Sequence, residues 1–295
     1  MKIALHIHHH SQIKAFRDSQ VDFVITEPLF SYKHPHVTDK AAFLSLLEAC
    51  LETNQKTYVE INGFIEEGDL EGLKTWIKEL LNYPISGFYF ADLAVYMMLK
   101  EAGYPGETIY APETILTNTL EVKTLLKSVD RVMISKELTL AEILTISETF
   151  PNQIEIFGAG HLLMSVSRRP LLSNYLSHIG QIENVINKVD YRIRELKRKE
   201  NMPIMEEDRT FCVFTQDIQN PLEELPQLIQ ANIFGIHLDS LFIEEKEAEL
   251  FFNQILSQNN SFDETKLRDF YLDHSDLPLF KGYFYRKTNL SKESV

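Results

Sequence analysis

Short apolar runs alternate along the chain with longer segments in which apolar positions recur every three to four residues. The short runs are typical of strands buried in a parallel sheet, and the longer segments are typical of amphipathic helices that cover it. Regular alternation of the two indicates right-handed βαβ units. The predicted strands are 2–7, 22–26, 57–61, 87–91, 108–111, 131–135, 153–157, 212–215 and 235–238.

The number of these units favours a closed α/β barrel of the (β/α)8 TIM type over an open doubly wound sheet. No GxGxxG motif follows the first strand, so the commonest signal for a Rossmann fold is missing. Nine predicted strands compete for eight places, and one of them must therefore lie outside the barrel. The predicted helices between the strands include 41–52, 70–81, 93–103 and 139–150.

Barrels of this length commonly form one domain, and we expect residues 1–295 to do so. The charged stretch 176–210 lacks an obvious strand, which predicts an inserted helical segment. Residues 246–295 are predicted to form a short C-terminal extension that includes the aromatic segment KGYFYRKT (281–288).

The chain has 29 basic and 43 acidic residues, a net charge of −14. This balance argues against broad, non-specific binding of nucleic acid, which depends on Lys and Arg. One dense basic run, RIRELKRK (192–199), could be a solvated helix face or a contact for RNA or a partner. Two cysteines exclude a disulfide framework, and no apolar run reaches the roughly 20 residues of a membrane span. We therefore expect a cytoplasmic protein with no membrane contact.

Reactive groups of a TIM barrel lie at the C-terminal ends of its strands. Carboxylates are frequent at these positions and could bind a cation or a basic ligand. The alternative for each of them is a helix N-cap or a loop salt bridge. The residues at these positions are His8, Glu27, Asn62, Asp92, Glu113, Glu137, His161, Asp217 and Asp239.

The histidines of HIHHH (6–10) raise the question of a metal site. Strand alternation places His6, His8 and His10 on one face, where they could contact zinc only if a fourth ligand arrives from elsewhere. The segment KHPHV (33–37) could supply it. The alternative, a polar strand end at the rim of the pocket, is our prediction, and we expect no metal.

The stretch EIFGAGHLLMSVSRRPLLSNY (155–175) follows an apolar strand with a Gly-rich turn and a helix-like segment. It resembles the signature of the U32 peptidase family, the collagenase-like proteases. Further similar segments are RVMISKELTLAEI (131–143), FADLAV (90–95), FTQDI (214–218) and YAPETILTN (110–118), so the resemblance extends over most of the chain. The matching signature positions are Glu155, Phe157, Gly160, Ser167, Arg169 and Ser173.

The strand ends and this resemblance together predict the site residues. We expect Glu155 and Arg169 to face one cavity with Glu137 at the barrel mouth, as an anion-facing or buried pair; the alternative is that they only fix a loop to the barrel. His161 could be a general base, a metal ligand or a hydrogen-bond donor of the loop. The predicted catalytic residues are Glu137, Glu155, His161 and Arg169, and the predicted substrate-binding residues are Asp92, Asn118, Arg168 and Asp217.

The chain departs from the family signature at its cysteines. Leu163 and Pro170 occupy their places, Ala159 occupies that of the histidine, and 176–210 contains no cysteine. In several relatives four such cysteines ligate an iron–sulfur cluster, which needs about four thiolates. A chain with two cysteines cannot build that cluster alone, so we predict no cofactor.

The resemblance implies three functions from different classes. Shorter, cysteine-poor members of the family are implicated in hydroxylating the wobble uridine of tRNA beside a longer, cysteine-bearing relative. We predict this role, with the longer relative as partner and tRNA bound mainly through it. The alternatives are a peptidase and a non-catalytic partner subunit. Neither a GxSxG elbow nor an HExxH motif is present to support peptidase chemistry.

Overall fold

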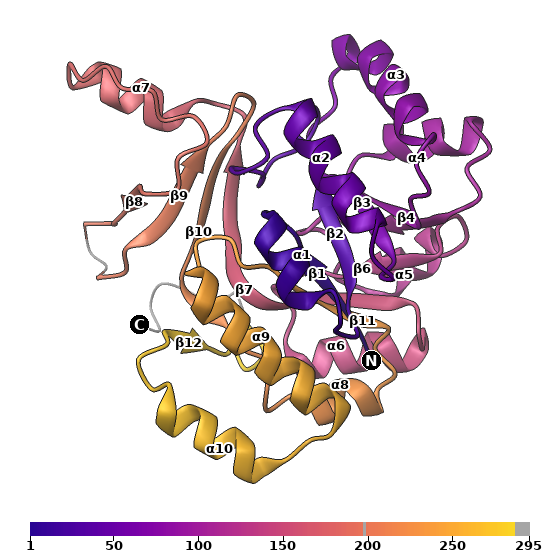
Figure 1. Cartoon of the computed structure of the whole chain (residues 1–295), viewed down its shortest axis with the longest axis vertical. Helices are drawn as coiled ribbons and strands as arrows, with labels where there is room; N and C mark the ends of the chain where they lie inside the picture. The colour runs from indigo at the N-terminus through magenta and orange to yellow at the C-terminus, as the bar shows by residue number, and fades with distance from the viewer. Residues whose placement is uncertain (197–198, 287–295) are drawn as a thin grey trace.

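The strands form a closed barrel. In the computed structural model, which describes residues 1–196 and 199–286, eight parallel strands follow the order β11-β1-β2-β3-β4-β5-β6-β7. Pairing of β11 with β7 closes the ring, which confirms the predicted (β/α)8 fold (Figure 1). The barrel strands are β1 (Lys2–His6), β2 (Asp22–Thr26), β3 (Thr57–Ile61), β4 (Gly87–Phe90), β5 (Glu107–Tyr110), β6 (Arg131–Met133), β7 (Ile154–Ser167) and β11 (Gly235–Leu238).

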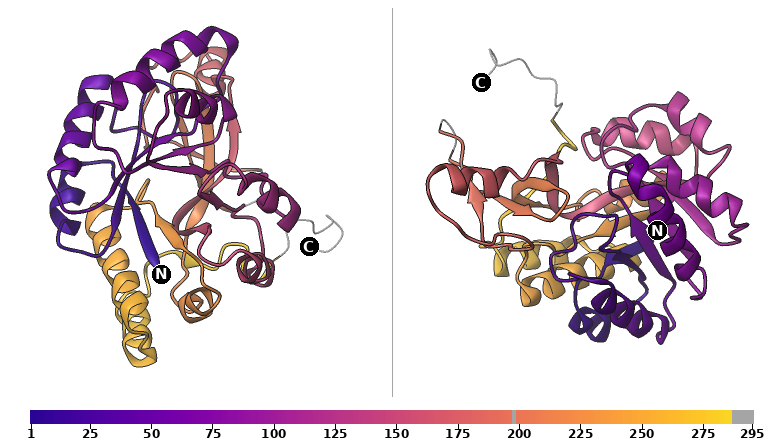
Figure 2. Two further views of the ribbon diagram at one scale, coloured as in Figure 1. Left: turned by 90° about the vertical axis from the view of Figure 1, so that its right-hand side faces the viewer. Right: turned by 90° about the horizontal axis from the view of Figure 1, so that it is seen from above.

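The helices of the barrel lie along the outside of its strands (Figure 2), because each of them presents an apolar stripe to the barrel. In α2 this stripe is Phe43, Leu46, Leu47 and Cys50, all buried. No helix among the described residues combines the length and hydrophobicity of a membrane span. The helices are α1 (His10–Phe16), α2 (Lys40–Leu51), α3 (Leu70–Leu80, after the 3-10 turn η1, Glu67–Asp69), α4 (Leu93–Glu101), α5 (Thr119–Leu125), α6 (Leu140–Thr149), α7 (Leu171–His178), α8 (Leu225–Gln230), α9 (Glu245–Asn260) and α10 (Glu264–Asp273).

Strand β7 belongs to two sheets. Its first residues pair with β6 and β11 in the barrel, and from Gly160 onward it pairs antiparallel with β10 (Phe211–Gln219). Strand β10 also pairs with β9 (Met202–Glu206) and with β12 (Leu279–Phe280), and β9 pairs with β8 (Arg192–Ile193). The outer part of β7 with α7, β8, β9 and β10 forms a projecting arm (Figures 1 and 2).

The arm corrects three sequence-based expectations. The glycines at 158 and 160 form no turn, because β7 continues through them as one strand. Predicted strand 212–215 lies in β10 and is the one outside the barrel. Segment 176–210 is helical only to His178 and then contains β8 and β9.

Helix α9 lies in the predicted C-terminal extension, but it follows β11 directly and buries Phe251 and Phe252 in the main core. It is therefore the last helix of the barrel, and the extension beyond the barrel begins after Asn260.

Candidate functional site

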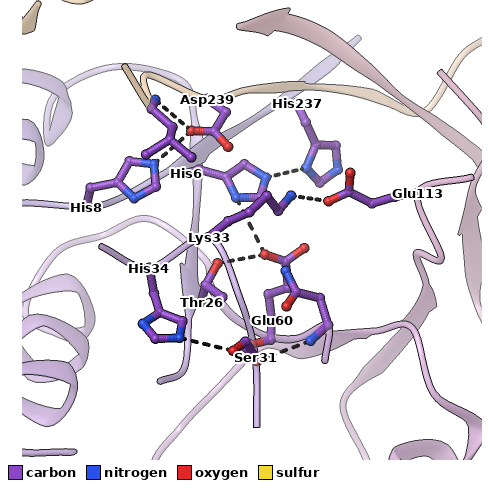
Figure 3. Close-up of polar contacts among 12 residues, drawn as sticks. His6, His8, Thr26, Ser31, Lys33, His34, Glu60, Glu113, His237 and Asp239 are labelled. Carbon is purple, nitrogen blue, oxygen red and sulfur yellow. Dashed lines mark hydrogen bonds and ion pairs between the residues drawn. The ribbon is translucent and has the colours of Figure 1, made fainter. Parts of the chain in front are cut away.

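The inward-facing positions change from apolar to polar toward the C-terminal end of the barrel. Ala4 and Val24 belong to an apolar layer inside it. Two residues further on, the same strand faces carry His6 and Thr26, because alternate residues of a strand point the same way. Thr26 donates a 2.6 Å hydrogen bond to Glu60 of β3, and all three polar side chains are buried. Figure 3 shows this group with residues from the adjoining loops.

A chain of hydrogen bonds links Glu155 on β7 through His237 on β11 to His6 on β1. Nε2 of His237 lies 2.6 Å from Oε2 of Glu155, and Nε2 of His6 lies 3.0 Å from Nδ1 of His237. Burial lowers the pKa of His6 to about 3, so this ring is neutral near pH 7. We assign the protons to Nε2 of both rings, which leaves Nδ1 of His6 as an acceptor 3.9 Å from Glu60. This relay can carry a proton between the barrel interior and its mouth.

His8 and Asp239 form a second buried pair at the ends of β1 and β11. Nε2 of His8 lies 2.7 Å from Oδ1 of Asp239, which also accepts from the N–H of Leu241 at 2.9 Å. Gln12 accepts from the N–H of His8 and donates to Ser240, 2.7 Å in both cases, and so ties the two loops together. Burial acts to raise the pKa of Asp239, but its interactions with His8, including the hydrogen bond, and with Lys33 lower it overall. The ionised carboxylate therefore fixes the orientation of His8.

A cavity of about 360 Å³ opens beside this His–Asp dyad, between α1, α9 and the arm. His9 and His36 line it with ring centroids 4.0 Å apart. Burial lowers the pKa of both rings, that of His36 to about 4, so both are neutral near pH 7. Phe242 and Arg192, whose guanidinium lies 5.6 Å from the Phe242 ring centroid, cover another side.

The loop after β2 carries Lys33 into the barrel mouth. Glu27, Asn62 and Glu207 accept hydrogen bonds from five backbone N–H groups of this loop. Lys33 itself has a φ of 68°, in the left-handed region that non-glycine residues rarely adopt. Such conformations persist only where the surroundings enforce them, and they cluster at functional sites.

Glu113 lies between two buried lysines. One carboxylate oxygen contacts Nζ of Lys33, and the other lies 3.2 Å from Nζ of Lys136, which also donates to the Glu113 carbonyl at 3.1 Å. The three side chains are only 6%, 3% and 9% exposed for Lys33, Lys136 and Glu113. Burial acts to raise the pKa of Glu113, but the two ammonium groups outweigh it and lower the pKa to about 2. Glu113 is therefore ionised, and its φ of 66° is also left-handed.

Another buried ion cluster lies at the opposite, N-terminal end of the barrel. Arg131 contacts Glu155 through Nε and lies 2.6 Å from Glu107 through Nη1. Tyr89 donates to Glu155 at 2.9 Å. Burial acts to raise the pKa of Glu155, but the hydrogen bond from the relay histidine and the nearby guanidinium lower it overall. Glu155 thus joins this lower cluster to the relay above it.

The prediction that Glu155, Arg169 and Glu137 face one cavity is wrong. Glu155 is the second residue of β7 and is buried inside the barrel, whereas Arg169 is the second residue beyond the end of the same 14-residue strand and is exposed. A strand rises about 3.3 Å per residue, so the two lie at opposite ends of it. Glu137 is half-buried in the turn after β6, where its N–H donates to Ser135 at 3.3 Å.

His161 lies on the part of β7 that runs along the arm. Its Nδ1 is 2.8 Å from the carbonyl oxygen of Thr215 on β10, and its ring meets Phe242 edge-on at 6.0 Å. Burial lowers the pKa of this imidazole. Asp217, also on β10, contacts Gln216 at 3.2 Å. Both predicted residues therefore lie on the strands of the arm, and His161 also contacts the loop after β11 through Phe242.

Asp92 and Asn118 cap helices. Asp92 accepts from the N–H of Ala94 at 2.8 Å in α4, and Asn118 accepts from two N–H groups in the first turn of α5, both at 3.1 Å. Capping is the alternative that the sequence left open for strand-end residues. Arg168 forms an ion pair with Glu66 at the surface. The catalytic and binding roles expected for these side chains stay predictions.

Sequence reasoning missed three residues of the barrel mouth: Lys33, Lys136 and His237. Lys33 lies in a loop without periodicity, and His237 lies inside an apolar strand that reads as core. Lys136 directly precedes the predicted Glu137. The available signal was the set of strand-end positions, which included His8, Glu113 and Asp239.

The N-terminal histidines separate in the structure. His6 and His8 both enter the barrel mouth, as alternation predicts, but His10 begins helix α1 and is exposed. Across residues 1–196 and 199–286, no three His, Cys, Asp or Glu side chains are arranged to hold a metal ion.

The cysteines do not fit an iron–sulfur cluster. Cys50 and Cys212 are buried in different hydrophobic clusters, one in the main core and one under the arm. Burial raises the pKa of both thiols, that of Cys50 to about 12, so neither is a thiolate near pH 7. These residues supply neither the number of ligands nor the proximity that a cluster requires.

Together these features define a class: a (β/α)8 barrel with a buried cluster of charged and imidazole groups at its C-terminal mouth, where TIM-barrel enzymes carry their active sites. Peptidase family U32 matches residues 9–289. The chain therefore belongs to peptidase family U32, and the resemblance seen in its sequence is confirmed.

Relatives of the chain carry names from two activities. tRNA hydroxylation protein P2 of Bacillus subtilis (strain 168) is 24% identical over 199 residues, 66% of this chain and 64% of that protein. tRNA hydroxylation protein P1 of the same strain is 25% identical over 196 residues, 64% and 44% of the two chains. A collagenase of Porphyromonas gingivalis is 26% identical over 139 residues, 43% and 33%. The chain thus spans less than two thirds of the length of each of these relatives.

Solved structures resemble the chain only distantly. The spore cortex-lytic enzyme SleL of Bacillus cereus has a TM-score of 0.47 at 9% identity, over 88% of this chain and 74% of that one. Orotidine 5'-phosphate decarboxylase of Pyrococcus horikoshii has a TM-score of 0.46 at 10% identity, over 88% and 99%. We draw nothing about activity from them.

Proposed function

We propose that this chain acts in hydroxylating the wobble uridine of tRNA, together with a longer member of peptidase family U32. The observation that carries the proposal is its similarity to two proteins named for tRNA hydroxylation, P2 and P1, each over about two thirds of the chain.

The barrel mouth supports a part in the chemistry. The relay from Glu155 through His237 to His6, and the dyad of His8 and Asp239, each orient a histidine by a hydrogen bond. Burial keeps His6 neutral, and a neutral, oriented imidazole can act as a general base. Hydroxylating a ring carbon requires its hydrogen to leave, and a base that takes a proton is one part of such a reaction. The oxidant and the oxygen source come from outside this chain.

The charge of the chain supports a partner for RNA binding. A net charge of −14 disfavours phosphate contacts, so we assign most of the RNA surface to the longer relative. The basic run 192–199 is an auxiliary patch in this proposal. Its Arg192 and Arg194 are exposed on the arm, while residues 197–198 lie outside the described part of the chain.

Mass spectrometry of tRNA nucleosides tests the role directly. A strain that lacks this gene should lose hydroxyuridine-derived nucleosides, and the native gene should restore them. Complementation with His237→Gln should restore few of them, because the relay is broken. His10→Gln, at an exposed position outside the barrel, is the matched control and should restore them fully. Unchanged tRNA in the deletion strain contradicts the proposal.

The second candidate is a peptidase, favoured by the similarity to a collagenase. Hydrolysis of gelatin by the purified chain, abolished by His8→Gln and unaffected by His10→Gln, would support it. The buried thiols speak against a cysteine nucleophile, because burial raises the pKa of both of them.

A further inference from the structure

Glu113 occupies a place that a ligand could take. We propose that Lys33 and Lys136 form a binding site for a small carboxylate anion, and that the side chain of Glu113 fills this site until the ligand displaces it. The inference goes beyond the proposed function, because it concerns a ligand that this chain binds by itself, without RNA or a partner.

The two ammonium groups are the first reason. Lys33 and Lys136 are 6% and 3% exposed, and an ammonium group is costly to bury without a counter-charge. Glu113 divides its two carboxylate oxygens between them. A ligand carboxylate in the same position would make the same two contacts, so Glu113 stands in for it.

The backbone is the second reason. Both Lys33 and Glu113 have left-handed φ angles, 68° and 66°, which cost free energy in non-glycine residues. The loop of Glu113 is irregular from 111 to 118, and Ile115 within it is 64% exposed. Release of Glu113 would relieve strain in a segment whose neighbouring residues Thr114 and Ile115 are exposed. By contrast, the loop of Lys33 is fixed by five backbone hydrogen bonds and would stay in place.

The surroundings are the third reason. The lysines come from the loops after β2 and β6, at the barrel end where TIM-barrel ligands bind. Lys33 reaches across the mouth toward His6 and Glu113 in Figure 3. Burial raises the pKa of the neighbouring Glu60, which favours its uncharged form and so lessens its repulsion of an anion, and His6 is neutral. An anion held by the lysines would lie beside the relay.

Calorimetric titration of the full chain with succinate and malonate tests the site. Glu113→Gln keeps the shape of the side chain but removes the competing charge, and it should bind at least one of the two anions about tenfold more tightly than the native chain. Adding Lys136→Met to Glu113→Gln should abolish this gain. Glu148→Gln and Lys127→Met, at exposed positions, are the matched controls and should bind as the native chain does.

Several results would overturn the proposal. They are the absence of saturable binding of both anions by Glu113→Gln, equal affinity for uncharged succinamide, and tighter binding of inorganic phosphate than of either dicarboxylate. If Glu113→Gln does not fold, hydrogen exchange of the native chain decides: amides 113–117 should exchange faster in saturating succinate, and no change contradicts displacement. The binding experiment contains no tRNA, so a negative result does not contradict the proposed role in tRNA hydroxylation. A negative result for that role likewise does not contradict anion binding.

Discussion

The two ends of the barrel carry mirror-image ion clusters. At the N-terminal end one arginine, Arg131, lies between two glutamates; at the C-terminal end one glutamate, Glu113, lies between two lysines. All members of the lower cluster are on strands, and all members of the upper cluster are on loops. In TIM barrels the lower face serves stability and the upper face carries chemistry. We therefore expect the ion cluster on the strands to stabilise the fold and the ion cluster on the loops, where the backbone can move, to serve the chemistry of the site.

The largest expected effect is at the lower cluster. Arg131→Met leaves Glu155 buried without its cation and should lower the free energy of unfolding by about 3–5 kcal/mol. Urea denaturation measures this loss. Lys56→Met is the control, because Lys56 contacts Glu107 of the same cluster from a position that is 54% exposed, and should cost less than about 1 kcal/mol. Equal losses would show that the lower cluster is not held by its buried arginine.

A smaller effect is expected at the upper cluster. Lys136→Met leaves Glu113 with Lys33, and the loop can adjust, so we expect a loss of about 2 kcal/mol by the same denaturation measurement. Lys127→Met, on the surface, should change little. If Lys136→Met costs as much as Arg131→Met, the loops are as rigid as the strands and the comparison fails.

The pH dependence separates the relay from both clusters. The pKa of His6 falls from 6.5 to about 3 in the folded protein, so the unfolded chain takes up the proton first as pH falls. This part of the stability is complete above pH 6.5 and is lost toward pH 3, by up to about 1.4 kcal/mol per pH unit. Glu113, with a folded pKa of about 2, adds a loss only below about pH 4.5. In His6→Gln the free energy of unfolding should therefore depend less steeply on pH between pH 7 and 5. In His10→Gln its pH dependence should be that of the native chain. If the free energy of unfolding has the same slope against pH in the native chain and in His6→Gln, His6 does not cause the pH dependence.

The smallest effect concerns the arm. Arg169→Ala should change the free energy of unfolding by less than about 0.5 kcal/mol, because the side chain is exposed. A double-mutant cycle with Glu155→Gln should give no coupling, since the two residues lie at opposite ends of β7. A coupling energy above about 0.5 kcal/mol would instead indicate that Glu155 and Arg169 interact, as the sequence suggested.

The barrel itself could be predicted because its signal is local. A short apolar run predicts each strand, and the alternation of strands with helices then implies the topology. The sequence also singled out Glu155, whose role as a site residue stays a prediction. Its partners could not be predicted, because Arg131, Tyr89 and His237 lie 24, 66 and 82 residues away and meet it only through closure of the barrel.

The arm shows a different limit. The glycines at 158–160 read as a turn, since glycine permits turns. In the structure Gly160 has a φ of 136°, and a Cβ there would lie 2.4 Å from the carbonyl oxygen of Asp239. The glycine therefore allows β7 to pass close to the loop after β11. Glycine serves both in a turn and where two backbone segments approach closely, and a single sequence does not distinguish the two cases.

Closure of the barrel between its first and last strands has a consequence for the timing of synthesis. Lys2 of β1 pairs with Gly235 of β11, so the edge of β1 stays without its partner until the ribosome has released nearly the whole chain. At about 5–20 residues per second, this interval is on the order of ten seconds or more. Pairing across so long a separation is also intrinsically slow. His6 and His237 meet only at that step, so the nascent protein acquires its relay last.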